Sequence, residues 1–331
     1  MKFHLVKIIE NVKKAVPYAN DLIFSDLNDL VYLNDVEILN NIDGNSIYNL
    51  DNKLVQIYDN EKGCYYFNGK IIKSDFFIKK SFRSSAVLAD SSPRRVSRGH
   101  YKRDIVILDS DLQTANEIIL NDIDYNLITY TQNELIVGGK ETLLAYSYQN
   151  QLLWQYSAVN NYNFLGIFKK DLLIVLDDSS ILRIDIETGE IKKRFNMILF
   201  SETENEVIAQ YNFIQLQDDK LIYYRYGQYA EYDLILNKMT YEFDIKENLE
   251  QEKLHDNIDS YIKEDDLLYF YISGFGSFSL PSIVVLNIRT NEILWKHSLN
   301  NPDVYYRDFQ KSENALYLLD SGNTLHIFEK D

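Results

Sequence analysis

The sequence predicts an all-β fold made of repeated strand units, and its repeats and strand pattern support this. The stretch 181–191, Ile-Leu-Arg-Ile-Asp-Ile-Glu-Thr-Gly-Glu-Ile, has the pattern of a strand, a tight turn and a second strand. Copies recur at 284–295 and 143–154, and weaker ones at 105–120 and 230–243. A unit of this kind cannot bury its apolar face alone, so the recurrence indicates an array of like units. We therefore expect a single β-propeller domain of seven or eight blades over the whole chain.

Two sets of apolar runs mark the expected blades along the chain. Runs that open on an acidic or amide residue are interpreted as second strands, and they lie at 28–33, 52–57, 171–176, 219–224, 266–270 and 314–319. Candidate fourth strands lie at 38–42, 70–76, 117–120, 152–156, 191–195, 239–243 and 293–297. Their number favours eight blades. Seven remains open if residues 10–80 form one irregular blade.

The two ends of the chain complement each other. Residues 315–319 and 324–328 have the pattern of strands with no fourth strand after them, and 2–9 reads as an orphan strand at the other end. Free sheet edges invite aggregation, so pairing the N-terminal strand with the last blade would remove two edges at once. We expect the N-terminal strand to close the ring in this way.

Two segments interrupt the strand rhythm. Residues 90–104 include Arg94 and Arg95 among five basic residues, and we expect a long surface loop that either neutralises acidic neighbours or contacts a partner. Residues 243–266 are rich in acidic side chains, and 246–257 have the pattern of a short amphipathic helix between blades.

Charge and cysteine usage narrow the classes of function. The formal net charge is -16, which disfavours nucleic-acid binding because that binding depends on clustered Lys and Arg. An acidic surface attracts a basic protein partner, or it only supports solubility. Cys64 is a single cysteine in a strand-like run, where a buried inert thiol is expected. The N-terminus does not resemble a signal peptide and no stretch resembles a membrane helix, so we expect a cytoplasmic, monomeric protein.

The sequence contains no pattern that predicts catalysis. The five histidines are scattered without metal-ligand spacing, and no phosphate-binding, nucleophile or calcium-binding motif is present. We therefore assign no catalytic residue, cofactor or metal ligand and expect the chain not to be an enzyme.

Aromatic side chains are the remaining candidates for a binding site. Tyr224, Tyr226 and Tyr229 belong to a tyrosine-rich run that either packs between blades or offers a recognition surface. Phe275, Phe278 and Leu280 lie among Gly and Ser in 274–281, and we expect this loop to project and bind a partner. With Arg94 and Arg95, these residues form the predicted partner-binding set.

The repeat resembles that of quinoprotein-like (PQQ-type, WD-like) β-propellers. The resemblance rests on residues 182–191 and 286–295 and on Trp154 at the tryptophan position, and it extends over about 104–330. It implies the propeller fold. No residue matches the quinone or calcium ligands of that family, so no catalytic residue is carried over.

Together these features favour a protein that binds one protein partner. The more specific prediction is an immunity protein that neutralises a cognate bacterial toxin by steric occlusion, with a basic toxin domain as the expected partner. The alternatives are a quinoprotein-like redox or small-molecule enzyme and a generic assembly scaffold.

Overall fold

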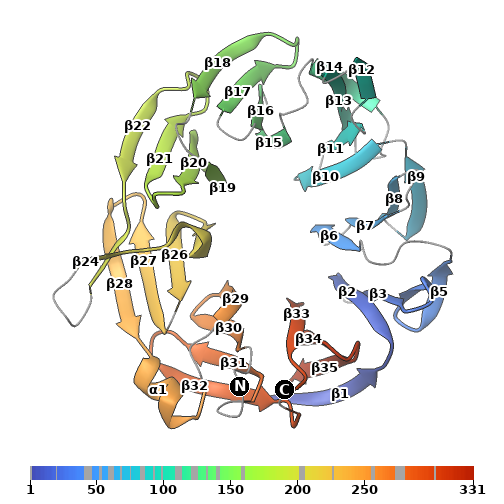
Figure 1. The fold of residues 1–331 in the computed structure, drawn as a ribbon, viewed down its shortest axis with the longest axis vertical. Coiled ribbons are helices and arrows are strands. Elements are labelled where there is room, and N and C mark those ends of the chain that lie inside the picture. Colours follow the sequence, from blue (N-terminus) through green and yellow to red (C-terminus); the bar gives the residue numbers. More distant parts are fainter. Residues whose placement is uncertain are drawn as a thin grey trace. The chain divides into compact units, whose positions relative to one another are not determined.

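The structure is a computed structural model, and its description covers most of the chain. The described residues are 2–19, 21–40, 47–51, 54–58, 63–67, 69–74, 76–82, 86–91, 94–97, 100–108, 114–120, 126–131, 133–138, 142–157, 161–200, 206–225, 227–254, 258–272, 280–301 and 303–331. The chain divides into two compact units, one formed by 1–89, 108–113 and 246–331 and the other by 90–107 and 114–245. Each unit is built from antiparallel sheets (Figure 1).

The first unit contains four four-stranded sheets and a short helix. The strands of three sheets follow chain order: β2 (Val12–Tyr18), β3 (Asp21–Asp26), β4 (Val31–Leu33) and β5 (Val36–Leu39); β6 (Tyr48–Asp51), β7 (Leu54–Tyr58), β8 (Gly63–Phe67) and β9 (Lys70–Ser74); β29 (Ile258–Glu264), β30 (Leu267–Ile272), β31 (Ser282–Asn287) and β32 (Glu292–Ser298). The fourth sheet has the order β1 (Phe3–Ile9), β35 (Leu325–Lys330), β34 (Ala315–Asp320) and β33 (Tyr306–Lys311). Helix α1 spans Lys246–Gln251 and buries Leu249, which confirms a helix in the predicted range 246–257 but only over its first six residues.

The second unit contains three four-stranded sheets and a two-stranded ribbon. The sheets are β15 (Asn126–Tyr130), β16 (Glu134–Gly138), β17 (Thr142–Ser147) and β18 (Leu152–Ser157); β19 (Tyr162–Phe168), β20 (Asp171–Leu176), β21 (Ile181–Asp185) and β22 (Ile191–Phe195); β25 (Ile214–Gln217), β26 (Lys220–Arg225), β27 (Gln228–Asp233) and β28 (Lys238–Asp244). The ribbon pairs β23 (Ile198–Phe200) with β24 (Glu206–Ile208), and the 3-10 helix η2 (Tyr211–Phe213) follows it. The sequence interpretation did not include this ribbon.

A five-stranded sheet lies in the segment 76–120. Its strands are β10 (Phe76–Phe82), β11 (Ala86–Ser91), β12 (Arg94–Ser97), β13 (His100–Leu108) and β14 (Thr114–Leu120), in the order β10-β11-β13-β12 with β14 beside β13. The expected long loop at 90–104 is therefore wrong, because Arg94 pairs with Lys102 and Arg95 with Tyr101 in an antiparallel hairpin. Charged residues suit an exposed strand as well as a loop, so composition alone misled the prediction.

The N-terminal strand completes the C-terminal sheet. β1 pairs antiparallel with β35, with Phe3 opposite Lys330 and Ile9 opposite Leu325, as predicted (Figure 1). Phe3 is buried and packs against Tyr269 and Trp295. The prediction of a second strand at 28–33 is wrong, because β4 at this place is third in its sheet. The predicted fourth strands at 152–156, 191–195, 239–243 and 293–297 are fourth in their sheets.

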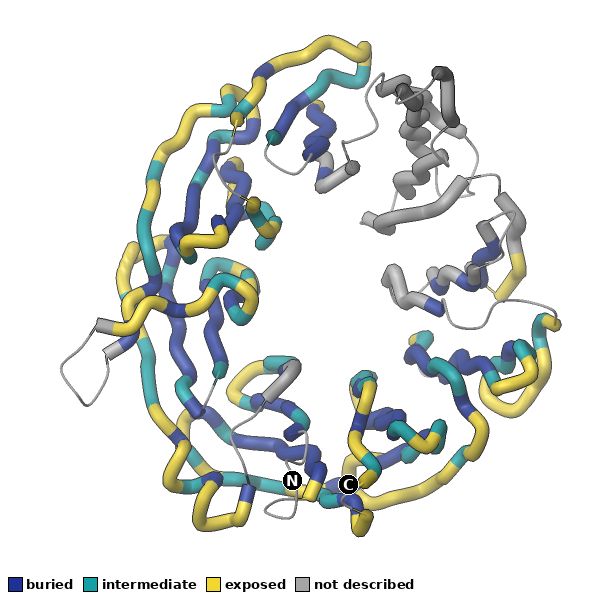
Figure 2. The backbone as a smooth tube through the Cα atoms, in the orientation of Figure 1, coloured by how far each residue is buried: buried dark blue, intermediate teal, exposed yellow. Residues whose placement is uncertain are grey.

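The core lies along the middle strands of each sheet. Every residue of β20 is buried, whereas the edge strand β22 is largely exposed, and Figure 2 shows the same contrast along the chain. A strand covered on both faces is apolar throughout rather than alternating. Side chains of neighbouring sheets then share clusters, such as Leu173 and Ile181 with Leu221 and Ala230 in the second unit.

The turn between third and fourth strands explains the sequence repeat. In the β21–β22 turn, the carboxylate of Asp185 accepts hydrogen bonds from the backbone N–H groups of Glu187 and Thr188, and Gly189 takes a positive φ of 73°. Asn287 accepts in the same way in the β31–β32 turn, where Asn291 has a φ of 58°. Asparagine and glycine both tolerate this backbone region, which explains how so few glycines serve so many turns.

Candidate protein-binding surface

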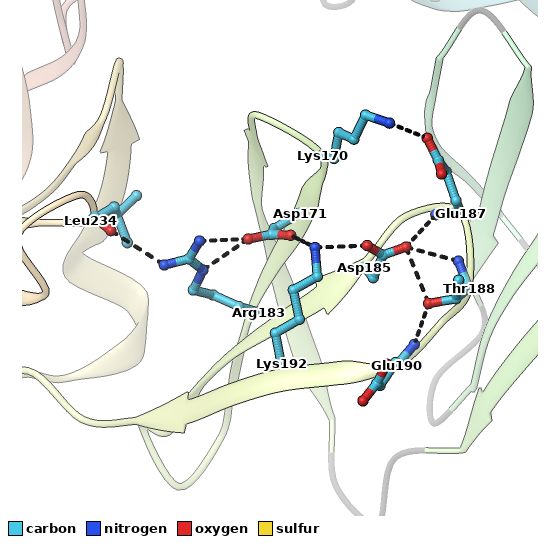
Figure 3. A network of polar contacts seen from close by, with 9 residues as sticks. All are labelled: Lys170, Asp171, Arg183, Asp185, Glu187, Thr188, Glu190, Lys192 and Leu234. Atoms are coloured by element: carbon cyan, nitrogen blue, oxygen red, sulfur yellow. Dashed lines mark hydrogen bonds and ion pairs between the residues drawn. The ribbon is translucent and has the colours of Figure 1, made fainter.

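A network of charged side chains crosses the sheet β19–β22 (Figure 3). Asp171 on β20 is 5% exposed and lies between two cations, since Arg183 Nη2 and Lys192 Nζ each come within 2.6 Å of its carboxylate oxygens. Lys192 Nζ also lies 2.6 Å from Asp185, the residue opposite Asp171 on the next strand. Two carboxylates facing each other across strands repel, so the ammonium between them stabilises the pair.

The network stabilises the fold rather than offering charges to a ligand. The hydrogen bond from Lys192 and those from the turn backbone lower the pKa of Asp185 to about 2. The hydrogen bond to Asp171 raises the pKa of Lys192. Arg183 Nη1 donates to the carbonyl oxygen of Leu234 in the neighbouring sheet at 3.2 Å. These groups neutralise one another, so we interpret the network as a link between two sheets of the second unit.

A second link joins the sheet β15–β18 to the same turn. Trp154 on β18 is buried, and its indole Nε1–H donates to the carbonyl oxygen of Ile186 at 2.8 Å. A Cβ at Gly189 would lie 2.7 Å from the indole ring, so the ring packs directly against the backbone of this glycine. Trp154 and Gly189 are therefore packing partners between two consecutive sheets.

The ribbon β23–β24 is held against the second unit by one of its faces. Met197, Leu199 and Ala209 are fully buried, and they belong to the cluster shared by the sheets β19–β22 and β25–β28. The backbone N–H of Ala209 donates to the carbonyl oxygen of Met197 at 2.9 Å. Downstream, the N–H of Tyr211 donates to the hydroxyl of Ser179. Buried side chains and hydrogen bonds thus hold the ribbon in place on the second unit.

The other face of the ribbon exposes apolar side chains. Ile198 and Ile208 are directly opposite in the register, so they share this face, and they are 37% and 47% exposed. Val207 is 39% exposed but is opposite Leu199, so it lies on the inward face of the ribbon. Exposed apolar side chains that gather on one element mark an interaction site more often than scattered ones. We therefore define Ile198 and Ile208 as the ribbon patch.

The sequence around the ribbon patch is acidic. Residues 195–219 contain no Lys or Arg, whereas Glu202, Glu204, Glu206, Asp218 and Asp219 fall within this range. An apolar patch in an acidic stretch suits a partner with apolar and basic side chains, because complementary charges favour encounter and exclude acidic competitors.

The predicted tyrosine site is corrected by the structure. Tyr224 and Tyr229 are fully buried, so neither presents a ring to a partner. The hydroxyl of Tyr229 donates to the buried carboxylate of Glu231 at 2.7 Å, which satisfies this phenol inside the sheet. Of the two alternatives for the tyrosine run, packing within and between sheets holds for these two residues. Tyr226 lies outside the described residues.

The other predicted site residues stay predictions. Phe275 and Phe278 lie outside the described residues, and Leu280 at the end of the predicted loop is 40% exposed. Arg94 and Arg95 lie on β12. Sequence reasoning missed the ribbon patch. A usable signal was present, since apolar runs at 197–200 and 207–208 flank the polar stretch 201–205, which is a hairpin pattern.

Two other features are absent from the described part of the chain. The His, Cys, Asp and Glu side chains there form no group of three that could hold a metal ion. No helix among these residues has the length and apolar character to cross a bilayer.

Comparison with solved structures identifies the fold. The crystal structure of Saccharomyces cerevisiae Sqt1 aligns over 99% of both chains with a TM-score of 0.61 and 11% sequence identity. The C-terminal WD40 domain of Sif2 aligns over 99% of this chain and 98% of its own, with a TM-score of 0.62 and 9% identity. The chain has a β-propeller fold. The computationally designed protein Ika8 aligns over 97% and 96% of the two chains, with a TM-score of 0.56 and 13% identity.

These likenesses concern the fold alone. BamB from Moraxella catarrhalis aligns over 99% of this chain at a TM-score of 0.44, which is too low to support the quinoprotein-like side of the predicted resemblance. No protein-family model matches the chain, and no curated protein matches it by sequence. The function must therefore be inferred from the surface of this propeller.

Proposed function

We propose that this β-propeller acts in the cytoplasm as a protein-binding module with no enzymatic activity of its own. The observation that carries the proposal is the ribbon patch, in which Ile198 and Ile208 face each other in exposed positions on a ribbon whose opposite face is buried. Because the ribbon is held in place by its buried face, a partner can contact Ile198 and Ile208 at little cost in conformational entropy. The net charge of -16 favours a basic partner.

The more specific proposal is an immunity protein that neutralises a cognate bacterial toxin. Binding through a rigid patch would place the bulk of the propeller over the toxin surface, so neutralisation follows from steric occlusion of the toxin active site. A basic toxin domain would meet complementary charge as it approaches.

Coexpression with the product of the adjacent gene tests this proposal. We expect that product to arrest growth when expressed alone and to be harmless when this chain is coexpressed. The double substitution of Ile198→Asp with Ile208→Asp should abolish protection, because it places charges in the apolar contact.

A matched control comes from the other end of the same unit. Ile235 and Leu236 are 53% and 59% exposed in the β27–β28 turn, so Asp at both positions changes charge and exposed apolar area similarly. This variant should still protect. An adjacent product that is harmless alone, or that stays toxic with the wild-type chain, contradicts the immunity proposal. Equal loss of protection in both variants contradicts the role of the ribbon patch.

A further inference from the structure

Among the described strands, β23 and β24 pair only with each other, as a sheet of two strands. Val207 and Ile208 of β24 are both substantially exposed, whereas β23 buries Leu199, so β24 is the more accessible strand. An open strand edge is a template for pairing with another chain.

The register shows which backbone groups face this edge. Ala209 N–H donates to Met197 O, and these two residues are opposite each other, so they form a hydrogen-bonded pair of the antiparallel ladder. Such pairs alternate with non-hydrogen-bonded pairs. The next pair, Ile198 with Ile208, is therefore non-hydrogen-bonded, and the N–H and C=O of Ile208 point away from β23.

We propose that the free edge of β24 binds an extended segment of the partner protein, which adds to the ribbon as a third strand. This inference rests on the proposed protein-binding function and specifies how the partner is held. Main-chain hydrogen bonds to Ile208 supply affinity, and side chains of the added strand that lie beside the ribbon patch supply specificity.

The chemistry of the added strand follows from its surroundings. Side chains of a strand alternate between two faces, so the face beside Ile198 and Ile208 suits apolar residues. The formal net charge of the chain is -16, so basic residues suit the remaining positions. The occupant is thus an extended segment with alternating apolar and basic side chains.

A synthetic peptide tests this mode of binding without knowledge of the natural partner. The probe is acetyl-Lys-Val-Lys-Val-Lys-Val-Lys-amide with a fluorescent label, titrated with the full chain and followed by fluorescence anisotropy. Its counterparts carry Glu in place of Lys, or N-methyl groups on the valines. We expect the Lys peptide to bind and both counterparts to bind at least about tenfold more weakly, since one loses charge complementarity and the other its main-chain donors.

Two substitutions at one position separate the backbone from the side chain. Ile208→Pro removes the outward N–H without removing an internal bond of the ribbon, whereas Ile208→Ala keeps the N–H and shortens the side chain. We expect Ile208→Pro to weaken binding of the Lys peptide about tenfold more than Ile208→Ala. Melting temperatures of the two variants report whether the propeller stays folded, and the N-methyl peptide tests the same point on unmodified protein.

The outcomes distinguish this inference from the broader proposal. Equal binding of the N-methyl and unmodified peptides overturns strand addition, and equal binding of the Glu and Lys peptides overturns the basic occupant. Dimerisation of the free chain through β24, seen as loss of the dimer in Ile208→Pro by sedimentation, would make a second copy the occupant and also overturn it. If Ile198→Asp with Ile208→Asp abolishes protection from the toxin while Ile208→Pro does not, strand addition fails and the proposed function stands.

Discussion

The last residue of the turn between third and fourth strands must adopt a positive φ, and in one turn it must also leave room for a neighbouring side chain. Asn237 and Asn291 occupy this position with positive φ values of 53° and 58°, which asparagine accepts. Gly189 has a φ of 73°, and it also lies under the indole ring of Trp154. Asparagine could adopt this φ, but its Cβ would clash with the ring of Trp154. The glycine of this turn is therefore required by two independent constraints.

Substitution of Gly189 by Ala should measure both constraints. The positive φ costs about 1 kcal/mol for a residue with a Cβ, and the clash with Trp154 should raise the total loss to about 2–3 kcal/mol. Gly69→Ala is a matched control, because Gly69 has a φ of 79° and nothing within 4 Å of the added Cβ. Urea unfolding of both variants checks this. Equal losses would show that Trp154 adjusts without cost.

The ion pairs of Asp185 predict a dependence of stability on pH. Contacts with Lys192 and the turn backbone lower the folded-state pKa of Asp185 to about 2 from 3.8. The folded chain then binds this proton less readily than the unfolded chain, so Asp185 stabilises the fold fully above about pH 4 and loses that effect between pH 4 and 2. Asp185→Asn should cost about 1 kcal/mol at pH 7, since water screens the half-exposed Lys192.

Comparison of two variants separates charge from turn capping. Asn keeps the side-chain oxygen that accepts from the turn backbone, whereas Asp185→Ala loses this acceptor as well. Urea unfolding at pH 7 and at pH 2 should show the difference between wild type and Asp185→Asn shrinking toward zero, while Asp185→Ala stays less stable at both values. A difference that persists unchanged at pH 2 would contradict the charge argument.

At the scale of elements, β1 stabilises the sheet that it forms with β35, β34 and β33. It pairs along its length with β35, and Phe3 is buried against Tyr269 and Phe328 in the same core cluster. By contrast, Leu5 and Ile8 are exposed, so the stabilising effect of β1 depends on its backbone pairing and on Phe3.

Deletion of residues 1–10 should therefore destabilise the chain markedly. Loss of a buried Phe costs about 3 kcal/mol or more, and loss of strand pairing leaves β35 with a free edge. Thermal unfolding checks this, with Phe3→Ala as a partial version and Lys7→Ala as a control that removes only the exposed ion pair with Asp35. A truncated chain that melts within a degree or two of the full chain would rule out a stabilising role for β1.

The elements also show what sequence reasoning can reach. The turn at Asp185 and Gly189 was predictable, because its hydrogen bonds and backbone angles are local. The burial of Tyr224 was not, since a strand covered on both faces shows no alternation to separate inside from outside. The ribbon was not predicted because its strands have three residues each, too short for a periodic signal. Its remaining signal was the hairpin pattern of two apolar runs around the polar stretch 201–205.

At the scale of the molecule, acidity and the β-propeller fold define the expected behaviour with a partner. The fold provides many surface turns on a packed scaffold, and the net charge of -16 acts at long range. The sequence repeat predicted the β-propeller fold, because the turn chemistry of each repeat is local. It could not predict the ribbon patch, because the exposure of Ile198 and Ile208 depends on which face of the ribbon meets the shared core.

Salt should change the rate of capture more than the lifetime of the complex. Screening shortens the reach of charge from about 30 Å at 0.01 M to about 8 Å at 0.15 M ionic strength. We expect the association rate constant with the adjacent-gene product to fall about tenfold over this range, with a smaller change in dissociation. Surface plasmon resonance at several salt concentrations measures both. A salt-independent association rate would restrict the acidity to a solubility trait.

Pairing between β1 and β35 also has a consequence for how the chain is made. β1 leaves the ribosome well before its partner β35, because the paired residues Ile9 and Leu325 are 316 residues apart in the sequence. At roughly 5–20 residues per second, that strand waits on the order of tens of seconds. Throughout this interval β1 has no strand to pair with, and its apolar residues Leu5, Val6 and Ile8 are exposed on the nascent chain. Chaperones bind unpaired apolar strands of this kind. A premature stop codon within β35 would make this waiting state permanent.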